Sequence, residues 1–216
     1  RRQRQMCIRD REEYLKFHQT SGTLGKPMTW LDTKRDWEWM LDNWKRVLEE
    51  AGIQKRAKCF FAFSFGPFLG FWTAYDAAHR MGCICMPGGG QGSEQRLRTI
   101  LEHGAEYLFC TPTYARRLPE VAKQKGIDLS GHRVRKIIVA GETGGSSPAF
   151  RKQVSDAWGN ELSVYDHYGM TEVGPVAYEI PGGCGGLRIL LDEYFPEVID
   201  PSGEKPVLEG ETGAVS

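Results

Sequence analysis

The stretch RKIIVAGETGGSSPAFRKQVSDAWG, residues 135–159, decides the fold of this chain. It opens with a short apolar run, IIVA, passes through a loop rich in glycine and serine, and ends in a segment with helical spacing of apolar residues. Short apolar runs of this kind, followed by a loop and a helix, are typical of strands that are buried on both faces of a sheet. The stretch therefore predicts one strand–loop–helix unit of an α/β fold.

The same alternation continues on both sides of this stretch. Besides the strand at 135–141 and the helix at 148–159, the pattern predicts helix 33–50, strand 58–63, helix 68–82, strand 83–86, helix 93–104, strand 107–111, helix 113–126 and strand 162–166. Strands that alternate with helices form parallel sheets, and continuously apolar strands indicate helices on both faces. The predicted fold class is α/β, with a parallel sheet covered by helices on both faces.

After Pro175 the pattern changes. Short segments separated by Gly-rich and Asp-Pro-Ser-Gly turns predict antiparallel strands or hairpins. We expect residues 12–175 to form an α/β core and residues 176–216 to begin a smaller β subdomain. Residues 1–11 differ in composition, lack the period of a helix or strand, and look like translated sequencing-adapter sequence, so we expect them to have no function.

Length and charge limit the classes of function. A chain of 216 residues can form one large domain that buries roughly 70% of its unfolded surface. The 28 Lys and Arg residues equal the 28 Asp and Glu residues, so the balance indicates neither nucleic acid nor an anionic membrane as a partner. Because the sequence lacks a run of about eighteen apolar residues and a signal segment, we expect a soluble, cytoplasmic protein.

The cysteines do not indicate a metal site. No two of them form a CxxC pair; they are Cys7, Cys59, Cys83, Cys85, Cys110 and Cys184. We interpret them mostly as reduced core residues, because several lie in apolar strand-like runs. Cys83 and Cys85 flank Ile84 and could share a metal, but no second ligand pair stands at a recognisable spacing. Zinc is the less favoured interpretation.

Residues 20–27, TSGTLGKP, place hydroxyls, glycines and a lysine together. Glycines allow backbone N–H groups to converge on an anion, and the hydroxyls and the lysine supply further donors. The common phosphate-loop pattern does not fit, because it requires four residues between its glycines and a Ser or Thr after its lysine. Gly22 and Gly25 enclose only two residues, and Pro27 follows Lys26. Taken alone, the stretch is equally compatible with a phosphate grip and with a polar turn.

Several separated motifs occur in one order: TSGTLGKP at 20–27, FSFGPFLGFW at 63–72, VAGETGGS at 139–146 and YDHYGMTEVGP at 165–175. Together they resemble the motifs of adenylate-forming enzymes. The phrases GCICMPGGGQ, CTPTY and GGLRILLDEYFPEVIDPSGE are similar to the phenylacetate-CoA ligase branch of that superfamily. The resemblance extends from about Glu13 to Ser216 and implies a truncated large domain of such an enzyme.

The resemblance implies a nucleotide site. The 20–27 loop would hold the β- and γ-phosphates of ATP, and Tyr168 would stack on adenine. Thr171 would hydrogen-bond the α-phosphate, and Glu172 would hold Mg²⁺. The implied nucleotide-binding set is Thr20, Ser21, Gly22, Thr23, Gly25, Lys26, Gly141, Glu142, Thr143, Tyr168, Gly169, Met170 and Thr171, and the implied catalytic set is Thr171, Glu172 and Lys26. A flat ring suits a purine and a carboxylate oxygen suits magnesium. The alternative for Thr171 and Glu172 is that they cap a turn.

The resemblance also implies an acyl pocket. The AGETGG loop, residues 140–145, would frame the adenine and the carboxylate of the substrate, with Ala140 and Gly141 beside the acid. Phe65 and Phe68 would line the pocket. For these two residues pocket and core remain equally open, because buried aromatic side chains before a helix often belong to the core.

The implied reaction begins with attack of a carboxylate on the α-phosphorus of ATP, which gives an acyl-adenylate and pyrophosphate. Mg²⁺, Lys26 and loop N–H donors must screen the two anions, and loss of one such donor costs about 3 to 4 kcal/mol of barrier. Coenzyme A would then take the acyl group. We expect an aryl or arylacetic acid as substrate, small molecules as partners, and a homodimer as a reasonable oligomeric state.

Two alternatives stay open at this point. One is adenylation followed by transfer to an amine or a carrier thiol, and the other is a non-catalytic module that binds a nucleotide or an acid. Leu24 stands where family loops usually carry a second threonine, and Arg188 stands where histidine is usual. The family's ribose-binding aspartate, hinge and C-terminal lysine domain are absent from residues 1–216, so we expect this chain alone not to be a competent enzyme.

Overall fold

A computed structural model of the chain describes residues 13–20, 25–159, 162–182, 185–200, 202, 205–207 and 212–215. Its helices are α1 (Lys34–Glu50), α2 (Trp72–Arg80), α3 (Ser93–His103), α4 (Pro112–Lys125) and α5 (Pro148–Trp158). Its strands are β1 (Tyr14–Gln19), β2 (Thr29–Thr33), β3 (Lys58–Phe61), β4 (Ile84–Pro87), β5 (Tyr107–Cys110), β6 (Lys136–Val139), β7 (Ser163–Met170), β8 (Gly174–Glu179), β9 (Leu187–Ile189), β10 (Val198–Ile199) and β11 (Ala214–Val215). The predicted alternation of strands and helices is confirmed.

The central sheet contains seven strands in the order β4-β3-β5-β6-β7-β8-β9. The strands from β4 to β7 in this order pair in parallel, which confirms the predicted parallel sheet. β8 and β9 extend one edge with antiparallel pairing. The hairpins β1–β2 and β10–β11 form separate two-stranded sheets.

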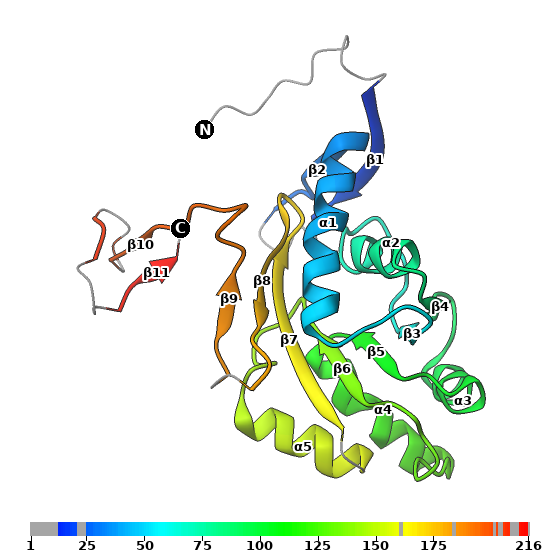
Figure 1. Cartoon of the computed structure of the whole chain (residues 1–216). Helices are drawn as coiled ribbons and strands as arrows, with labels where there is room; N and C mark the ends of the chain where they lie inside the picture. Colours follow the sequence, from blue (N-terminus) through cyan, green and yellow to red (C-terminus); the bar gives the residue numbers. More distant parts are fainter. Residues whose placement is uncertain are drawn as a thin grey trace.

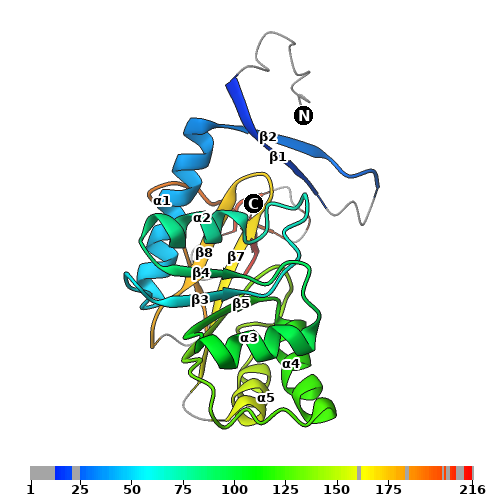
Figure 2. The same ribbon diagram turned by 90° about the vertical axis from the view of Figure 1, so that its right-hand side faces the viewer.

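Helices cover both faces of this sheet (Figures 1 and 2). Neighbouring residues of a strand point to opposite faces, so each central strand contributes to two cores. Phe61 and Ile138 pack in the core beneath α1 and α2. Phe60 and Ile137 pack in the core formed with α3, α4 and α5. This burial on two sides explains why the central strands are almost continuously apolar.

α1 begins with a capping box. The hydroxyl of Thr33 accepts a hydrogen bond from the Asp36 N–H at 3.3 Å, and the Asp36 carboxylate accepts one from the Thr33 N–H at 3.0 Å. Such a box satisfies two backbone donors at a helix start. The helix buries one face, made of Trp37, Met40, Leu41, Asn43, Trp44, Val47 and Leu48. Trp37 and Trp44 are therefore core residues.

β7 changes its pairing partner along its length. Residues 163–166 pair in parallel with β6, and residues 167–170 pair with β8 in the antiparallel sense. The sequence pattern ends this strand at residue 166 and leaves residues 167–172 as a loop, which is wrong for residues 167–170. They continue the strand because β8 supplies backbone partners beyond the point where β6 ends, and the turn comprises residues 171–173.

Two further boundaries differ from the sequence-based expectation. α2 begins at Trp72 instead of residue 68, because Gly70 has a positive φ angle of 37°, which a right-handed helix excludes. β8 spans the expected division between residues 175 and 176, so the antiparallel region starts as an extension of the main sheet. The division into a core and a β subdomain stays a prediction.

Shortening a side chain should destabilise the protein much more in a central strand than in the edge strand of the sheet. Ile138 in β6 is fully buried, whereas Ile84 in the edge strand β4 is 49% exposed. We expect Ile138→Ala to lower the free energy of unfolding by about 2 to 5 kcal/mol, because it leaves a cavity. The matched change Ile84→Ala should cost no more than about 1 kcal/mol. Urea unfolding of both variants checks this, and equal losses would contradict the two-core arrangement.

Candidate functional site

Several loops, among them segments predicted to bind ligands, follow the carboxyl ends of parallel strands. Residues 62–71 follow β3, residues 88–92 follow β4, residues 140–147 follow β6, and the second half of β7 extends beyond β6. The loops after parallel strands meet at one edge of a sheet, and ligands of open α/β sheets bind there. In Figures 1 and 2 the β7–β8 turn and the hairpin β1–β2 lie toward the same end of the molecule.

The hairpin β1–β2 presents the 20–27 loop, whose base the structure describes. The Thr20 N–H donates to the Met28 carbonyl at 3.0 Å, and the Thr20 hydroxyl accepts from the Met28 N–H at 2.9 Å. Thr20 therefore joins the two ends of the loop through hydrogen bonds to Met28. This role adds to its predicted contact with phosphate. Gly25 and Lys26 are exposed. Ser21, Gly22 and Thr23, also predicted to hold phosphate, lie outside the described residues.

A buried polar pair fixes this hairpin to the body of the protein. His18 Nδ1 lies 3.2 Å from Asp32 Oδ2, and both side chains are buried. The imidazole stacks on the indole of Trp37 in α1, with 5.4 Å between ring centroids and 7° between planes. The Gln19 N–H donates to the Pro67 carbonyl at 2.7 Å, which joins the hairpin to the loop after β3. The sequence analysis did not identify this anchor, because its members are far apart in the sequence.

The loop after β3 holds the two phenylalanines predicted for the acyl pocket. Phe65 is half-buried and packs edge-on against Trp72 and Tyr75, with centroid distances of 4.7 and 5.3 Å. Its positive φ is a strained conformation for a residue with a large side chain. Phe68 is 49% exposed. Phe65 thus contributes to packing at the rim of the core, whereas the ring of Phe68 is open to a ligand.

Residues 140–147 form the loop predicted to frame adenine. Ala140 is half-buried against the core beneath α1 and α2, while Gly141 and Thr143 are exposed. The Glu142 carboxylate accepts a hydrogen bond from the Thr113 N–H at 2.9 Å, at the start of α4. Burial alone would raise the pKa of Glu142, but hydrogen bonds from Thr113 and Thr111 outweigh it and hold the pKa below its usual range. Glu142 therefore fastens the loop to α4.

The end of β7 and the following turn carry the remaining predicted residues. Tyr168 is 48% exposed and Met170 is 43% exposed. Gly169 lies tightly against β8, because a Cβ atom there would approach the Gly174 carbonyl oxygen to 2.6 Å. Thr171 and Glu172 are half-buried in the turn. A half-exposed ring beside a hydroxyl and a carboxylate provides an aromatic face and oxygen donors at one place.

A polar network that the sequence analysis missed links the 140–147 loop to β7 and β8. Ser146 donates to Asp166 Oδ2 at 2.5 Å, and the Asp166 N–H donates to Glu179 Oε2 at 3.0 Å. Arg151 binds both oxygens of Glu179, at 2.6 and 2.7 Å. Asp166 and Glu179 are 8% and 6% exposed. Buried charges need such partners, and their place next to the loop makes them part of the site.

The pKa values of Asp166 and Arg151 are both raised, for different physical reasons. Burial raises the pKa of Asp166, against the hydrogen bonds from Ser146 and the His167 N–H. The hydrogen bonds to Glu179 raise the pKa of Arg151, so its guanidinium stays charged. Arg151 and Glu179 thus form the ion pair of the network. Burial makes the charged form of Asp166 less favourable.

His167 is a buried histidine in this part of β7. It is 6% exposed and packs against the indole of Trp44, with 4.2 Å between ring centroids. Within the part of the chain that the structure describes, neither ring nitrogen has a hydrogen-bond partner. Burial lowers the pKa of His167 to about 3, so the imidazole is neutral at physiological pH.

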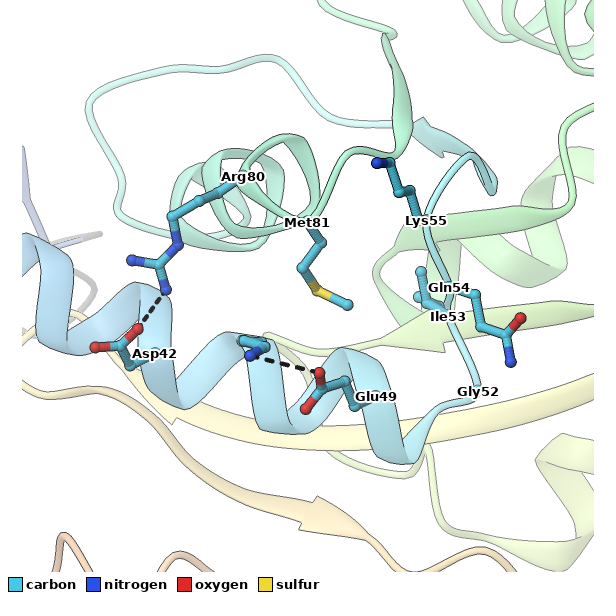
Figure 3. Close-up of a pocket in the computed structure, with 9 residues that line it drawn as sticks. Asp42, Glu49, Gly52, Ile53, Gln54, Lys55, Arg80 and Met81 are labelled. Atoms are coloured by element: carbon cyan, nitrogen blue, oxygen red, sulfur yellow. Dashed lines mark hydrogen bonds and ion pairs between the residues drawn. The ribbon is translucent and has the colours of Figure 1, made fainter.

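A groove of about 700 Å³ lies elsewhere on the protein, between α1 and the end of α2 (Figure 3). Its walls carry two ion pairs, Arg80 with Asp42 and Lys45 with Glu49. Gly52 and Lys55 precede β3, and Met81 precedes β4, so the groove faces the amino ends of the strands. It is therefore remote from the edge where the predicted residues gather, and four of its five charged side chains already form ion pairs with one another.

The described residues also bear on metals and membranes. Cys59, Cys83, Cys85 and Cys110 are free thiols, and in the described ranges no cluster of three or more His, Cys, Asp or Glu side chains could hold a metal ion. Cys7 and Cys184 lie outside these ranges. No helix in the part of the chain that the structure describes is long and apolar enough to cross a membrane.

The fold and the loop arrangement define an open α/β protein whose loops meet at the carboxyl edge of its parallel sheet, the edge where such sheets commonly bind ligands. More specifically, the chain belongs to the family of AMP-binding enzymes, whose family model matches residues 7–215. It is 31% identical over 209 residues to phenylacetate-coenzyme A ligase of Escherichia coli, a match that covers 94% of this chain and 46% of that protein. The corresponding ligase of Thermus thermophilus is 30% identical over 207 residues, with 95% and 46% coverage.

A solved structure shows the same fold. 2-Hydroxyisobutyryl-CoA ligase, in an open conformation with 2-HIB-AMP and CoA, superposes with a TM-score of 0.85 and 23% sequence identity. The match covers 94% of this chain and 44% of that chain. The present chain thus spans about half the length of the proteins that it matches. These matches confirm the resemblance to adenylate-forming enzymes.

Gly145 should be intolerant of any side chain. A Cβ atom there would lie 2.5 Å from Asp166 Oδ1 and 2.7 Å from a methyl group of Val139. We expect Gly145→Ala to lower the free energy of unfolding by about 1 to 3 kcal/mol, because neighbouring atoms must move. Gly131→Ala, where nothing lies within 4 Å, is the matched control and should be neutral or slightly stabilising. Thermal or urea unfolding of both variants checks this, and an unchanged Gly145→Ala protein would contradict the packing.

His167 should make the protein sensitive to acid. Between the ordinary pKa of 6.5 and the folded-state pKa of about 3, the unfolded chain binds a proton that the folded protein does not. Stability is therefore lost as pH falls through this window, by roughly 2 kcal/mol between pH 7 and pH 5. We expect His167→Phe to lose less stability than wild type over this interval by about that amount. Urea unfolding at both pH values measures the difference, and parallel pH profiles would refute it.

Proposed function

We propose that this chain forms the nucleotide- and acyl-binding part of an AMP-forming acid–CoA ligase that activates an aryl or arylacetic acid. One observation carries the proposal. Two segments predicted to bind the nucleotide, residues 140–147 and the end of β7, follow the paired stretches of the neighbouring parallel strands β6 and β7, in a chain that belongs to the AMP-binding enzymes. Its similarity to phenylacetate-coenzyme A ligases supports the choice of acid class.

In the proposed site, the exposed ring of Tyr168 stacks on adenine. The ring is 48% exposed at the end of β7 and is free to take a flat ligand on one face. Stacking of a base on an aromatic side chain is tolerant of small shifts and requires no directional partner. The 140–147 loop, which Ser146 and Glu142 fasten at two points, closes the other side.

The turn after β7 and the 20–27 loop hold the phosphates. Thr171 donates its hydroxyl to the α-phosphate, and the exposed Lys26 pairs with the β- and γ-phosphates. Glu172 suits magnesium, because this ion is commonly bound by one or two carboxylates together with substrate phosphates. When bound, the ion would neutralise charge that develops on the pyrophosphate leaving group.

The reaction needs no general base. A carboxylic acid is ionised at neutral pH, and one carboxylate oxygen attacks the α-phosphorus as the bond to pyrophosphate breaks. Ala140 and Gly141 orient the carboxylate, and the open ring of Phe68 forms part of the acyl pocket. The thiol of coenzyme A then attacks the acyl carbon and releases AMP.

The other predictions of this proposal concern the whole enzyme. The complete protein would act on small molecules in the cytoplasm, and a homodimer stays a reasonable expectation.

Titration calorimetry of the chain with AMP and with Mg²⁺·ATP tests the proposal. Tyr168→Ala should weaken the binding of both nucleotides roughly ten- to hundredfold, because it removes the aromatic ring on which adenine stacks. Tyr168→Phe, which retains the ring, is the matched control and should bind within about threefold of wild type. Glu172→Gln should weaken Mg²⁺·ATP alone and leave AMP binding in the absence of magnesium unchanged. AMP binding that survives Tyr168→Ala would refute the proposed adenine site.

A further inference from the structure

The position of the hairpin β1–β2 depends on side-chain contacts. The hairpin forms a two-stranded sheet of its own, and Figure 2 shows it at one end of the molecule, apart from the seven-stranded sheet. β2 ends at Thr33 and α1 begins at Lys34, whereas β1 reaches that helix only by way of the loop and β2. A two-stranded hairpin needs packing against another element to be stable. Contacts of β1 with the body of the protein must therefore hold it in place.

One face of β1 makes these contacts. Leu15 and Phe17 point away from the body of the protein and are 64% and 54% exposed. Lys16, on the other face, has its Nζ 4.1 Å from the centroid of the Trp37 indole in α1 and 3.3 Å from Asp76 Oδ2 in α2. The indole N–H of Trp37 donates to the same Asp76 oxygen at 3.0 Å. Lys16 therefore links β1 to both helices.

His18 and Asp32 form the deeper contact on this face. They are 4% and 3% exposed, and His18 Nδ1 lies 3.2 Å from Asp32 Oδ2. Because an ionised carboxylate can only accept hydrogen bonds, Nδ1 carries the proton and donates. The same imidazole lies flat on the indole of Trp37, with 7° between the ring planes. The hydrogen bond joins β1 to β2, and the stacking joins β1 to α1.

Burial makes this hydrogen bond costly to break. A buried carboxylate that loses its donor is left unsatisfied. The hairpin could relieve this cost only by moving until water reaches the carboxylate of Asp32. The bond between His18 and Asp32 thus couples the burial of the pair to the position of the hairpin.

The pair lies next to the proposed phosphate grip. Thr20, which joins the two ends of the 20–27 loop, follows His18 by two residues, and Lys26 belongs to the same loop. A shift of β1 against α1 would therefore move Thr20 and Lys26 together. Groups that bind a ligand must be held within about 0.5 Å of their productive position, and neighbouring residues supply that support.

We propose that His18 and Asp32 are positioning residues for the β- and γ-phosphates of the nucleotide. Their hydrogen bond, held against Trp37, fixes the hairpin so that Thr20 and Lys26 face these phosphates. This inference rests on the proposed function, but it concerns residues that do not touch the nucleotide in that proposal.

The proposed site divides the nucleotide between two parts of the fold. Tyr168 and Thr171, at the end of β7 and in the turn after it, take adenine and the α-phosphate, which AMP also contains. The hairpin takes the β- and γ-phosphates, which AMP lacks. The ratio of the two dissociation constants, for AMP and for Mg²⁺·ATP, therefore reports the hairpin alone. A general loss of folded protein would weaken the binding of both nucleotides equally.

The test compares Asp32→Ala, Asp32→Asn, His18→Phe and a control, Glu49→Gln. Asp32→Asn retains an oxygen that accepts from His18. His18→Phe retains a ring that can stack on Trp37 but removes the donor, so the hydrogen bond is broken from either side. Glu49 forms an exposed ion pair with Lys45 at 3.7 Å, near the other end of α1.

Calorimetry measures the affinity of each variant for AMP and for Mg²⁺·ATP. Hydrogen–deuterium exchange of residues 14–20 and 28–33 is measured without nucleotide, and thermal unfolding identifies any global loss of structure. These readouts separate the position of the hairpin from the stability of the whole chain.

We expect Asp32→Ala and His18→Phe to weaken the binding of Mg²⁺·ATP at least about tenfold, the range for loss of a hydrogen bond to a charged group, and to leave AMP within about threefold of wild type. Both variants should speed exchange in the hairpin. Asp32→Asn should restore both readouts toward wild type, and Glu49→Gln should change neither.

Three outcomes overturn the inference while the proposed adenine site stands. Equal weakening of AMP and Mg²⁺·ATP in Asp32→Ala and His18→Phe would show that the pair does not act on the outer phosphates. Wild-type affinity for Mg²⁺·ATP in both variants would show that the pair does not position the hairpin. Equal losses in Asp32→Ala and Asp32→Asn would show that the hydrogen bond is not responsible. A wild-type chain that fails to bind AMP is a different result, because it removes the proposed function and this inference together.

Discussion

The structure depends on the change of partner along β7. Its first half completes the parallel sheet against β6, and its second half pairs with β8 in the opposite sense. This change ends the parallel sheet at an edge where loops can meet, and it carries Tyr168 beyond β6 as part of a paired strand. The candidate adenine face is therefore held by backbone hydrogen bonds on β8, which is more rigid than a free loop.

Buried charge is concentrated at this transition. Asp166, Arg151 and Glu179 form a satisfied network instead of lying apart in an apolar core, in agreement with the cost of burying unpaired ions. His167 lies on the opposite face of β7, where burial lowers its pKa and keeps the imidazole neutral. The two residues are neighbours in the sequence, and strand geometry sends them into different environments.

The fold was largely predictable, because strands that are buried on both faces of a sheet appear in the sequence as short, continuously apolar runs. Runs such as IIVA at 137–140 can only be strands of a covered sheet when helices flank them at this spacing. The start of α2 was not predictable in this way, since a glycine at position 70 does not by itself reveal that its φ angle is positive. The strand character of residues 167–170 was missed because it depends on β8. In the site, Tyr168, Thr171 and Glu172 were recognisable as a motif, whereas Asp166 with Ser146 and the pair of His18 with Asp32 were not.

The sequence by itself determined the fold class, the order of strands and helices, and the family, because apolar period and ordered motifs are local properties of the chain. The tertiary structure alone decided which polar residues form hydrogen bonds with one another. Ser146 and Asp166 are separated by a helix and a strand, and His18 and Asp32 by a loop. Hydrogen bonds between such residues depend on how the sheet twists and how its loops pack, and no short pattern of residues encodes that geometry.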